Sequence, residues 1–121
     1  MPTRPRPLVP LLLVLVFTLV ACQSGSAASP ADAPPVRGVT TVDAKDLKFL
    51  PPAIEVAPGT EVTSRFVDGP IPHNVKGDGF ASEDQSRGTF SHRFAQPGEY
   101  RYTCTLHAGM DGRVVVAAEG G

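Results

Sequence analysis

The 121-residue chain is poor in several residue types that define common protein classes. It has two cysteines and three histidines, and its 11 lysines and arginines nearly balance its 12 acidic residues. The chain lacks the basic stripe that nucleic-acid-binding proteins usually carry. It also lacks a sustained helical repeat of apolar residues and any internal sequence repeat. These absences argue against a nucleic-acid partner, a helical bundle and a repeat protein.

The N-terminus lacks an apolar run long enough for a comfortable membrane span. Arg4 and Arg6 precede a short apolar stretch from Leu8 to Val20, so residues 1–21 are predicted to be a signal peptide. The stretch ends in Leu19-Val20-Ala21-Cys22, which resembles the bacterial lipobox, in which the cysteine is lipidated. Lipidation of Cys22 would anchor the protein to the bacterial membrane, facing the periplasm or the cell exterior. The alternative is ordinary secretion, with cleavage in the following Ala/Ser-rich stretch.

Residues 22–35 have few residues that can contribute to a core. Serine, alanine and proline dominate this stretch, and such a composition is typical of a tether. The remaining residues, 36–119, are enough for one small domain with a single core. The expected organisation is therefore a signal peptide, a tether and one domain.

Prolines and glycines divide residues 36–119 into short runs, which favours an all-β sandwich or barrel. The runs are rich in β-branched and aromatic residues. Strands are expected within residues 36–43, 54–56, 60–67, 90–94, 100–104 and 113–118, with a short strand beginning or ending at Val75. Residues 45–52 are expected to form a strand or an irregular crossing. In the run before residue 105, Tyr100, Tyr102 and Cys104 lie on one face at a period of two.

Three potential metal ligands follow each other at three-residue intervals, Cys104, His107 and Met110. A thiolate, an imidazole and a weak thioether suit copper better than zinc, magnesium or calcium. A trigonal site with two histidines, one cysteine and a distant methionine needs one more histidine, and His73 is the candidate. If Cys22 is lipidated, Cys104 has no disulfide partner, and a metal would protect its thiol. The alternatives are an inert buried cysteine, a methionine that fills a core gap and a surface histidine.

These residues resemble those of a small cupredoxin, a type 1 blue copper protein of the plastocyanin/amicyanin type. The resemblance rests on Pro72-His73-Asn74-Val75, on Pro97 to Tyr102 and on Cys104 to Val116. It implies a Greek-key β-sandwich of about seven to eight short strands. It also implies one copper ion that cycles between Cu(I) and Cu(II). By this resemblance His73, Cys104 and His107 are strong ligands, Met110 is the weak axial ligand, and Asn74 ties the two ligand loops together.

The chain departs from the family pattern at two positions. Leu106 stands where members of this type often have proline, and we hypothesise that its N–H donates to the Cys104 thiolate. Thr103 stands where plastocyanin has an exposed aromatic residue. We therefore expect partners to dock at the edge of His107, beside the apolar 70–72 loop. The remaining histidine, His92, is expected to be structural.

The function expected from these observations is one-electron transfer by a monomer. Its partners would be redox proteins of a membrane electron-transfer chain, and the lipid anchor would be its only membrane attachment. The alternative is a module that buffers or delivers copper in the periplasm or outside the cell. Catalysis is not expected, because an additional copper site would need histidines and only His92 is spare.

Overall fold

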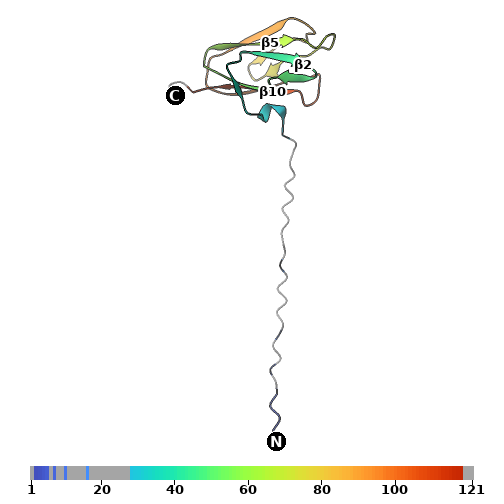
Figure 1. Cartoon of the computed structure of the whole chain (residues 1–121), viewed down its shortest axis with the longest axis vertical. Coiled ribbons are helices and arrows are strands. Elements are labelled where there is room, and N and C mark those ends of the chain that lie inside the picture. The colour runs from blue at the N-terminus through green and yellow to red at the C-terminus, as the bar shows by residue number, and fades with distance from the viewer. Residues whose placement is uncertain (1, 6, 8–9, 11–15, 17–27, 119–121) are drawn as a thin grey trace.

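The computed structural model describes residues 2–5, 7, 10, 16 and 28–118. Cys22 and most of the predicted signal peptide lie outside the described residues, so lipidation and cleavage stay predictions. Among the described residues, no helix is both long enough and apolar enough to cross a membrane. Residues 36–118 fold into two β-sheets that enclose the core (Figure 1).

The prediction of an all-β sandwich is confirmed, with ten strands in the described part of the chain. One sheet has the order β1-β4-β10-β9-β6-β7 and the other β3-β2-β5-β8. The number exceeds the expected seven to eight for two reasons. The run expected over 36–43 divides into β1 and β2, and the two residues of β7 are too few to stand out in the sequence. The elements are η1 (Pro30–Asp32), β1 (Val36–Arg37), β2 (Thr41–Lys45), β3 (Lys48–Leu50), β4 (Ala53–Val56), β5 (Thr60–Phe66), β6 (Lys76–Gly77), β7 (Phe80–Ala81), β8 (Thr89–Phe94), β9 (Gly98–Thr103) and β10 (Asp111–Val116).

The core lies between the two sheets and is supplied by alternate residues of the strands. In β10, for example, Gly112, Val114 and Val116 are buried, while the residues between them are half-buried. The Tyr102 ring packs edge-on against Phe49, with 4.8 Å between ring centroids. It also lies against β10, where a Cβ atom added to Gly112 would come within 2.2 Å of the ring. The absence of a side chain at Gly112 therefore leaves room in the core for the ring of Tyr102, which precedes Cys104 by two residues.

His92 lies on β8 among aromatic rings, as expected for a structural histidine. Its ring stacks on Phe80, with centroids 4.8 Å apart and an interplanar angle of 24°. Phe94 meets it edge-on at 4.7 Å. These contacts assign the half-buried imidazole to the edge of the core.

Strands β9 and β10 form the hairpin that carries the Cys104–Met110 segment. They pair antiparallel from Gly98 opposite Val116 to Thr103 opposite Asp111. The segment joins them at one end of the sandwich. The register of the hairpin therefore holds Cys104 and Met110, the two ends of the segment, close together.

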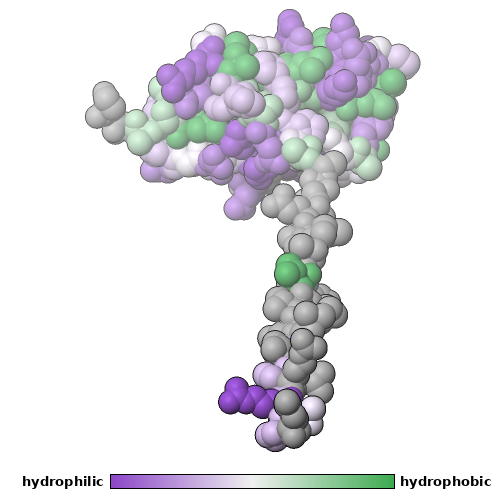
Figure 2. Space-filling model, turned by 60° about the horizontal axis from the view of Figure 1, so that its bottom comes forward, coloured by the Kyte–Doolittle hydropathy of each residue, from purple (hydrophilic) through white to green (hydrophobic). Residues whose placement is uncertain are grey.

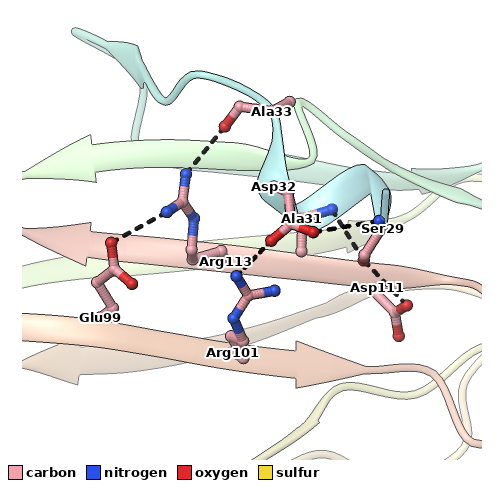
Figure 3. A network of polar contacts seen from close by, with 8 residues as sticks. All are labelled: Ser29, Ala31, Asp32, Ala33, Glu99, Arg101, Asp111 and Arg113. Carbon is pink, nitrogen blue, oxygen red and sulfur yellow. Dashed lines mark hydrogen bonds and ion pairs between the residues drawn. The ribbon is translucent and has the colours of Figure 1, made fainter. Parts of the chain in front are cut away.

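Residues 29–33 differ from the predicted tether because they pack against this hairpin (Figure 3). The short helix η1 begins at a capping box: the Ser29 hydroxyl accepts from the Ala31 N–H at 3.2 Å. The Ser29 N–H donates to Asp32 at 3.2 Å. Ala31 is 1% exposed, so this alanine is part of the folded domain. We call residues 29–35 the N-terminal strap.

Charged side chains of β9 and β10 hold the strap in place (Figure 3). Arg101 of β9 pairs with Asp32. Arg113 of β10 donates to the Ala33 carbonyl at 2.9 Å and to Glu99 at 3.0 Å. The Ser29 hydroxyl also donates to the Asp111 carboxylate at 3.2 Å. The strap thus binds the two strands that flank the ligand segment, which its composition alone did not indicate.

The surface view shows small groups of hydrophobic residues interspersed with hydrophilic ones over the visible face (Figure 2). Four of the large apolar side chains that remain exposed belong to loops and turns, namely Leu47, Val67, Ile71 and Leu106. Two of these, Ile71 and Leu106, lie beside predicted metal ligands in the sequence.

Candidate metal centre

His73 is held in the loop between β5 and β6, and its side chain is fully buried. Its backbone pairs with that of Gln85 in both directions. The His73 N–H donates to the Gln85 carbonyl at 2.9 Å, and the Gln85 N–H donates to the His73 carbonyl at 2.8 Å. This isolated bridge fixes the backbone from which the imidazole projects.

The Cys104–Met110 segment closes on itself directly after β9. The Cys104 N–H donates to the Met110 carbonyl at 2.9 Å, and the Met110 N–H donates to the His107 carbonyl at 3.3 Å. The Thr103 hydroxyl also donates to the Met110 carbonyl, at 3.1 Å. Gly109 supplies a φ of 77°, which side chains rarely allow. Cys104 and Met110, the two ends of the loop, are both buried.

Three of the four predicted ligands meet at one point. One potential ligand atom from each of His73, Cys104 and His107 lies within 4.8 Å of the other two. The Cys104 Sγ is 3.9 Å from His73 Nδ1. The two imidazole rings meet edge-on, with 4.8 Å between centroids. The fourth predicted ligand, Met110, is 1% exposed at the end of the same loop.

The hydrogen bonds of the two imidazoles determine which nitrogen is free. His107 Nε2 lies 3.0 Å from the Pro72 carbonyl, and His73 Nε2 lies 2.8 Å from Asp68 Oδ2. The hydrogen bond from His73 lowers the pKa of Asp68, against the opposing effect of burial, so this carboxylate is ionised at neutral pH. Carbonyl and carboxylate oxygens only accept, so Nε2 carries the proton in both rings. In this tautomer Nδ1 of each ring carries no proton and is available as a metal ligand.

Asn74 joins the two loops that carry the candidate ligands. Its Oδ1 accepts from the Thr105 N–H at 2.9 Å, and its Nδ2 donates to the Thr105 hydroxyl at 2.7 Å. Nδ2 also donates to Asp84 at 2.8 Å. Because Asn74 is 1% exposed, these bonds are shielded from competing water. They fix Thr105, which follows Cys104, relative to Asn74, which follows His73.

The backbone donor to the cysteine sulfur differs from the one hypothesised. The Asn74 N–H donates to Cys104 Sγ at 3.5 Å. Within the described residues, Leu106 makes no hydrogen bond to this sulfur; its side chain is 41% exposed. In the turn after Cys104, all of which the structure describes, the Thr105 N–H donates to Asn74 Oδ1 and also leaves the sulfur without a donor from its own loop. The sulfur is thus supported by the neighbouring loop.

Sequence reasoning missed Asp68, Asp84, Thr105 and Gln85. Asp68 belongs to an Asp-Gly-Pro turn, which indicates a loop but not the direction of the carboxylate. Gln85 acts through its backbone, so its residue type carries no signal. Only the adjacency of Thr105 to Cys104 could have suggested that it supports the site.

The donor set fits copper. Two imidazole nitrogens and one thiol converge, and a buried thioether ends the loop, whereas no carboxylate belongs to the converging group. Magnesium and calcium require oxygen ligands, and structural zinc sites rarely use methionine. Trigonal His₂Cys sites with a distant methionine are typical of copper proteins that transfer electrons.

The site lies just beneath the surface. His107 is half-buried, and its hydrogen bond to Pro72 joins it to the 70–72 loop. Ile71 is 38% exposed and Leu106 is 41% exposed. Apolar side chains from both ligand loops are therefore accessible, while the cysteine sulfur is enclosed.

Comparisons with known proteins agree with this chemistry. The model of a family described as copper binding proteins, plastocyanin/azurin family, matches residues 36–117. Amicyanin-alpha of Methylorubrum extorquens is 34% identical over 104 residues, which are 79% of this chain and 85% of that protein. The reduced Cu(I) form of an amicyanin mutant at pH 4 superposes with a TM-score of 0.60 and 28% identity, over 74% of this chain and 90% of the other. A purple cupredoxin from Nitrosopumilus maritimus gives a TM-score of 0.60 with 25% identity, over 65% of this chain and 100% of the other.

Proposed function

Because this chain belongs to the plastocyanin/azurin family of copper-binding proteins, we propose that His73, Cys104, His107 and Met110 hold its copper ion. The protein is an amicyanin-like electron-transfer protein, and its cofactor is one copper ion. The observation that carries the ligand assignment is the convergence of both imidazoles with the buried thiol within 4.8 Å. A bound copper ion supplies a one-electron couple to this group of residues.

The residues around the site restrict how far the ligands can move. The Gln85 bridge holds His73, the Asn74 side chain holds the start of the ligand loop, and the bond from Cys104 to Met110 closes that loop. A site that moves little when its metal changes charge suits electron transfer, because little reorganisation accompanies each step.

Partner redox proteins are proposed to dock at the edge of His107. This imidazole is the most accessible of the three converging side chains, and Ile71, Pro72 and Leu106 offer apolar contacts beside it. A small apolar surface suits brief association, which a carrier needs to exchange partners. The proposed partners belong to a membrane electron-transfer chain, and the carrier acts as a monomer.

The proposed location is the outer face of the bacterial membrane. The N-terminal charged and apolar segments and the lipobox-like Cys22 support lipidation and export. Mass spectrometry of the mature protein should find a diacylated or triacylated Cys22 at the N-terminus. Cleavage beyond Cys22, or an unmodified cysteine, would contradict the anchor while leaving the copper site unaffected.

Electron transfer is favoured over copper delivery by the burial of the donors. A delivery protein must release its ion to an acceptor, whereas Cys104 and Met110 are enclosed and their loop is closed by hydrogen bonds. Catalysis by this chain is not proposed, because His92 is committed to aromatic contacts.

Repeated redox cycling of the copper-loaded full chain tests the proposal. Alternate chemical oxidation and reduction in the presence of a copper chelator should leave the ion bound through many cycles. Steady loss of copper to the chelator in either oxidation state would instead support delivery. Failure to bind copper at all would contradict both functions.

A further inference from the structure

Asp68 lies between the buried imidazole of His73 and the turn that connects β2 to β3. Its Oδ2 accepts from His73 Nε2–H at 2.8 Å and from the Leu47 N–H at 3.3 Å. The Asp68 side chain is 11% exposed and that of His73 is 0% exposed. The carboxylate is thus a mostly enclosed acceptor with donors from two separate parts of the chain.

The turn that supplies the second donor has an unusual backbone. Asp46 and Leu47 connect β2 to β3 with φ values of 54° and 57°. This left-handed conformation suits the two-residue hairpin turn, but leucine rarely adopts it and asparagine or glycine is preferred there. The conformation brings the Leu47 N–H to the Asp68 carboxylate. A strained position that persists usually has surrounding contacts that maintain it, and Asp68 supplies such a contact here.

We propose that Asp68, held by the Leu47 N–H, is a positioning residue for His73. It keeps the proton of His73 on Nε2, directs the free Nδ1 toward the Cys104 thiol and places one negative charge behind the ligand. The proposal rests on the proposed function only in treating His73 as a ligand. It adds a residue that determines how strongly the site prefers copper(II) over copper(I).

The preference follows from charge and hydrogen bonding. A carboxylate bonded to the far nitrogen of a histidine ligand orients the ring and raises its basicity. A nearby negative charge also favours the more highly charged oxidation state, and the effect is larger where water is excluded. Without an acceptor at position 68, the buried His73 N–H would lose its partner. Asp68 therefore stabilises copper(II) and lowers the reduction potential of the site.

Asp68→Asn separates the charge from the hydrogen bond, because an asparagine carbonyl oxygen still accepts from Nε2–H. The variant should bind copper(II) about 10–100-fold more weakly. At a fixed potential the ratio of Cu(I) to Cu(II) should rise about tenfold, which is about 59 mV for a one-electron couple. Asp78→Asn is the control: it removes the same charge from the exposed turn between β6 and β7. On a logarithmic scale, Asp78→Asn should change the copper(II) affinity and the Cu(I)/Cu(II) ratio by less than about a quarter as much as Asp68→Asn.

The tautomer of His73 is measured in the metal-free full chain by the nitrogen-15 chemical shifts of its imidazole. The wild-type ring should carry its proton on Nε2, and Asp68→Ala should lose this preference. A proton on Nδ1 in the wild type, or an Asp68→Asn potential no different from that of Asp78→Asn, would overturn the proposal. If the wild type binds no copper, the ligand assignment fails, whereas the metal-free tautomer still tests the positioning role.

Discussion

Asn74→Ala tests whether the bridge between the two ligand loops stabilises the fold without supplying a ligand. The substitution removes the three side-chain hydrogen bonds to Thr105 and Asp84 but keeps the Asn74 backbone N–H that donates to Cys104. The ligand set is unchanged. The free energy of unfolding should therefore fall, whereas the absorption spectrum of the copper-loaded protein should change little.

The expected loss follows from the environment of these bonds. Two of them join neutral groups, and the third has a charged acceptor, so each is worth about 1 kcal/mol or somewhat more. Thr105 and Asp84 are exposed and recover part of this energy by binding water once Asn74 is gone. The net loss in the free energy of unfolding should be about 2–3 kcal/mol. For a domain of this size that corresponds to a fall in Tm of about 8–24 °C.

Urea unfolding of the metal-free protein measures this loss, with metal-free protein used because bound copper would add its own stabilisation. Thr105→Val is the matched variant, since it removes only the bond from Asn74 Nδ2 to the Thr105 hydroxyl. It should cost about 1 kcal/mol, and the double variant should be less destabilised than the sum of the two. A loss below about 0.5 kcal/mol for Asn74→Ala, or strict additivity with Thr105→Val, would refute the bridge.

Three further substitutions test the core, the β2–β3 turn and the strap. Gly112→Ala should lower the free energy of unfolding by about 1–3 kcal/mol, because the new Cβ meets the Tyr102 ring; an unchanged urea midpoint would contradict this contact. Leu47→Gly should raise the free energy of unfolding by about 0.5–1 kcal/mol, because glycine adopts the left-handed conformation without strain. A lower free energy of unfolding would show that contacts of the leucine side chain outweigh this strain. The Arg101 hydrogen bond lowers the pKa of Asp32 in the folded protein. Asp32 therefore stabilises the fold above the ordinary carboxyl pKa of 3.8 and loses this contribution as pH falls through its lowered value. Asp32→Asn should flatten the acid limb of the stability profile, and an identical acid limb would exclude this pair as a contributor.

The convergence of the candidate ligands could be anticipated from the sequence because metal chemistry restricts both residue type and spacing. Cys104, His107 and Met110 stand close together, and few histidines were available to complete the set. The all-β fold was predictable for a similar reason, since prolines and glycines leave room only for short strands. The two-residue strand β7 was not predictable, because a pair of residues shows no periodicity.

The supporting contacts were less predictable because they join residues far apart in the chain. The strap has a composition typical of a tether, and it is bound by Arg101 and Arg113, which follow it by many residues. Asp68 carries no signal of its own until the fold brings Leu47 beside it. In the same way, the Asn74 N–H reaches the Cys104 sulfur only through the packing of two loops.

The visible and electron paramagnetic resonance spectra of the copper(II) protein, compared with those of Cys104→Ser, test the central claim most directly. A buried thiolate with two imidazoles and a weak thioether predicts an intense blue absorption and a narrow copper hyperfine splitting, both lost when the sulfur is replaced. A pale wild-type spectrum typical of tetragonal copper, or a Cys104→Ser variant that stays blue, would contradict the assignment.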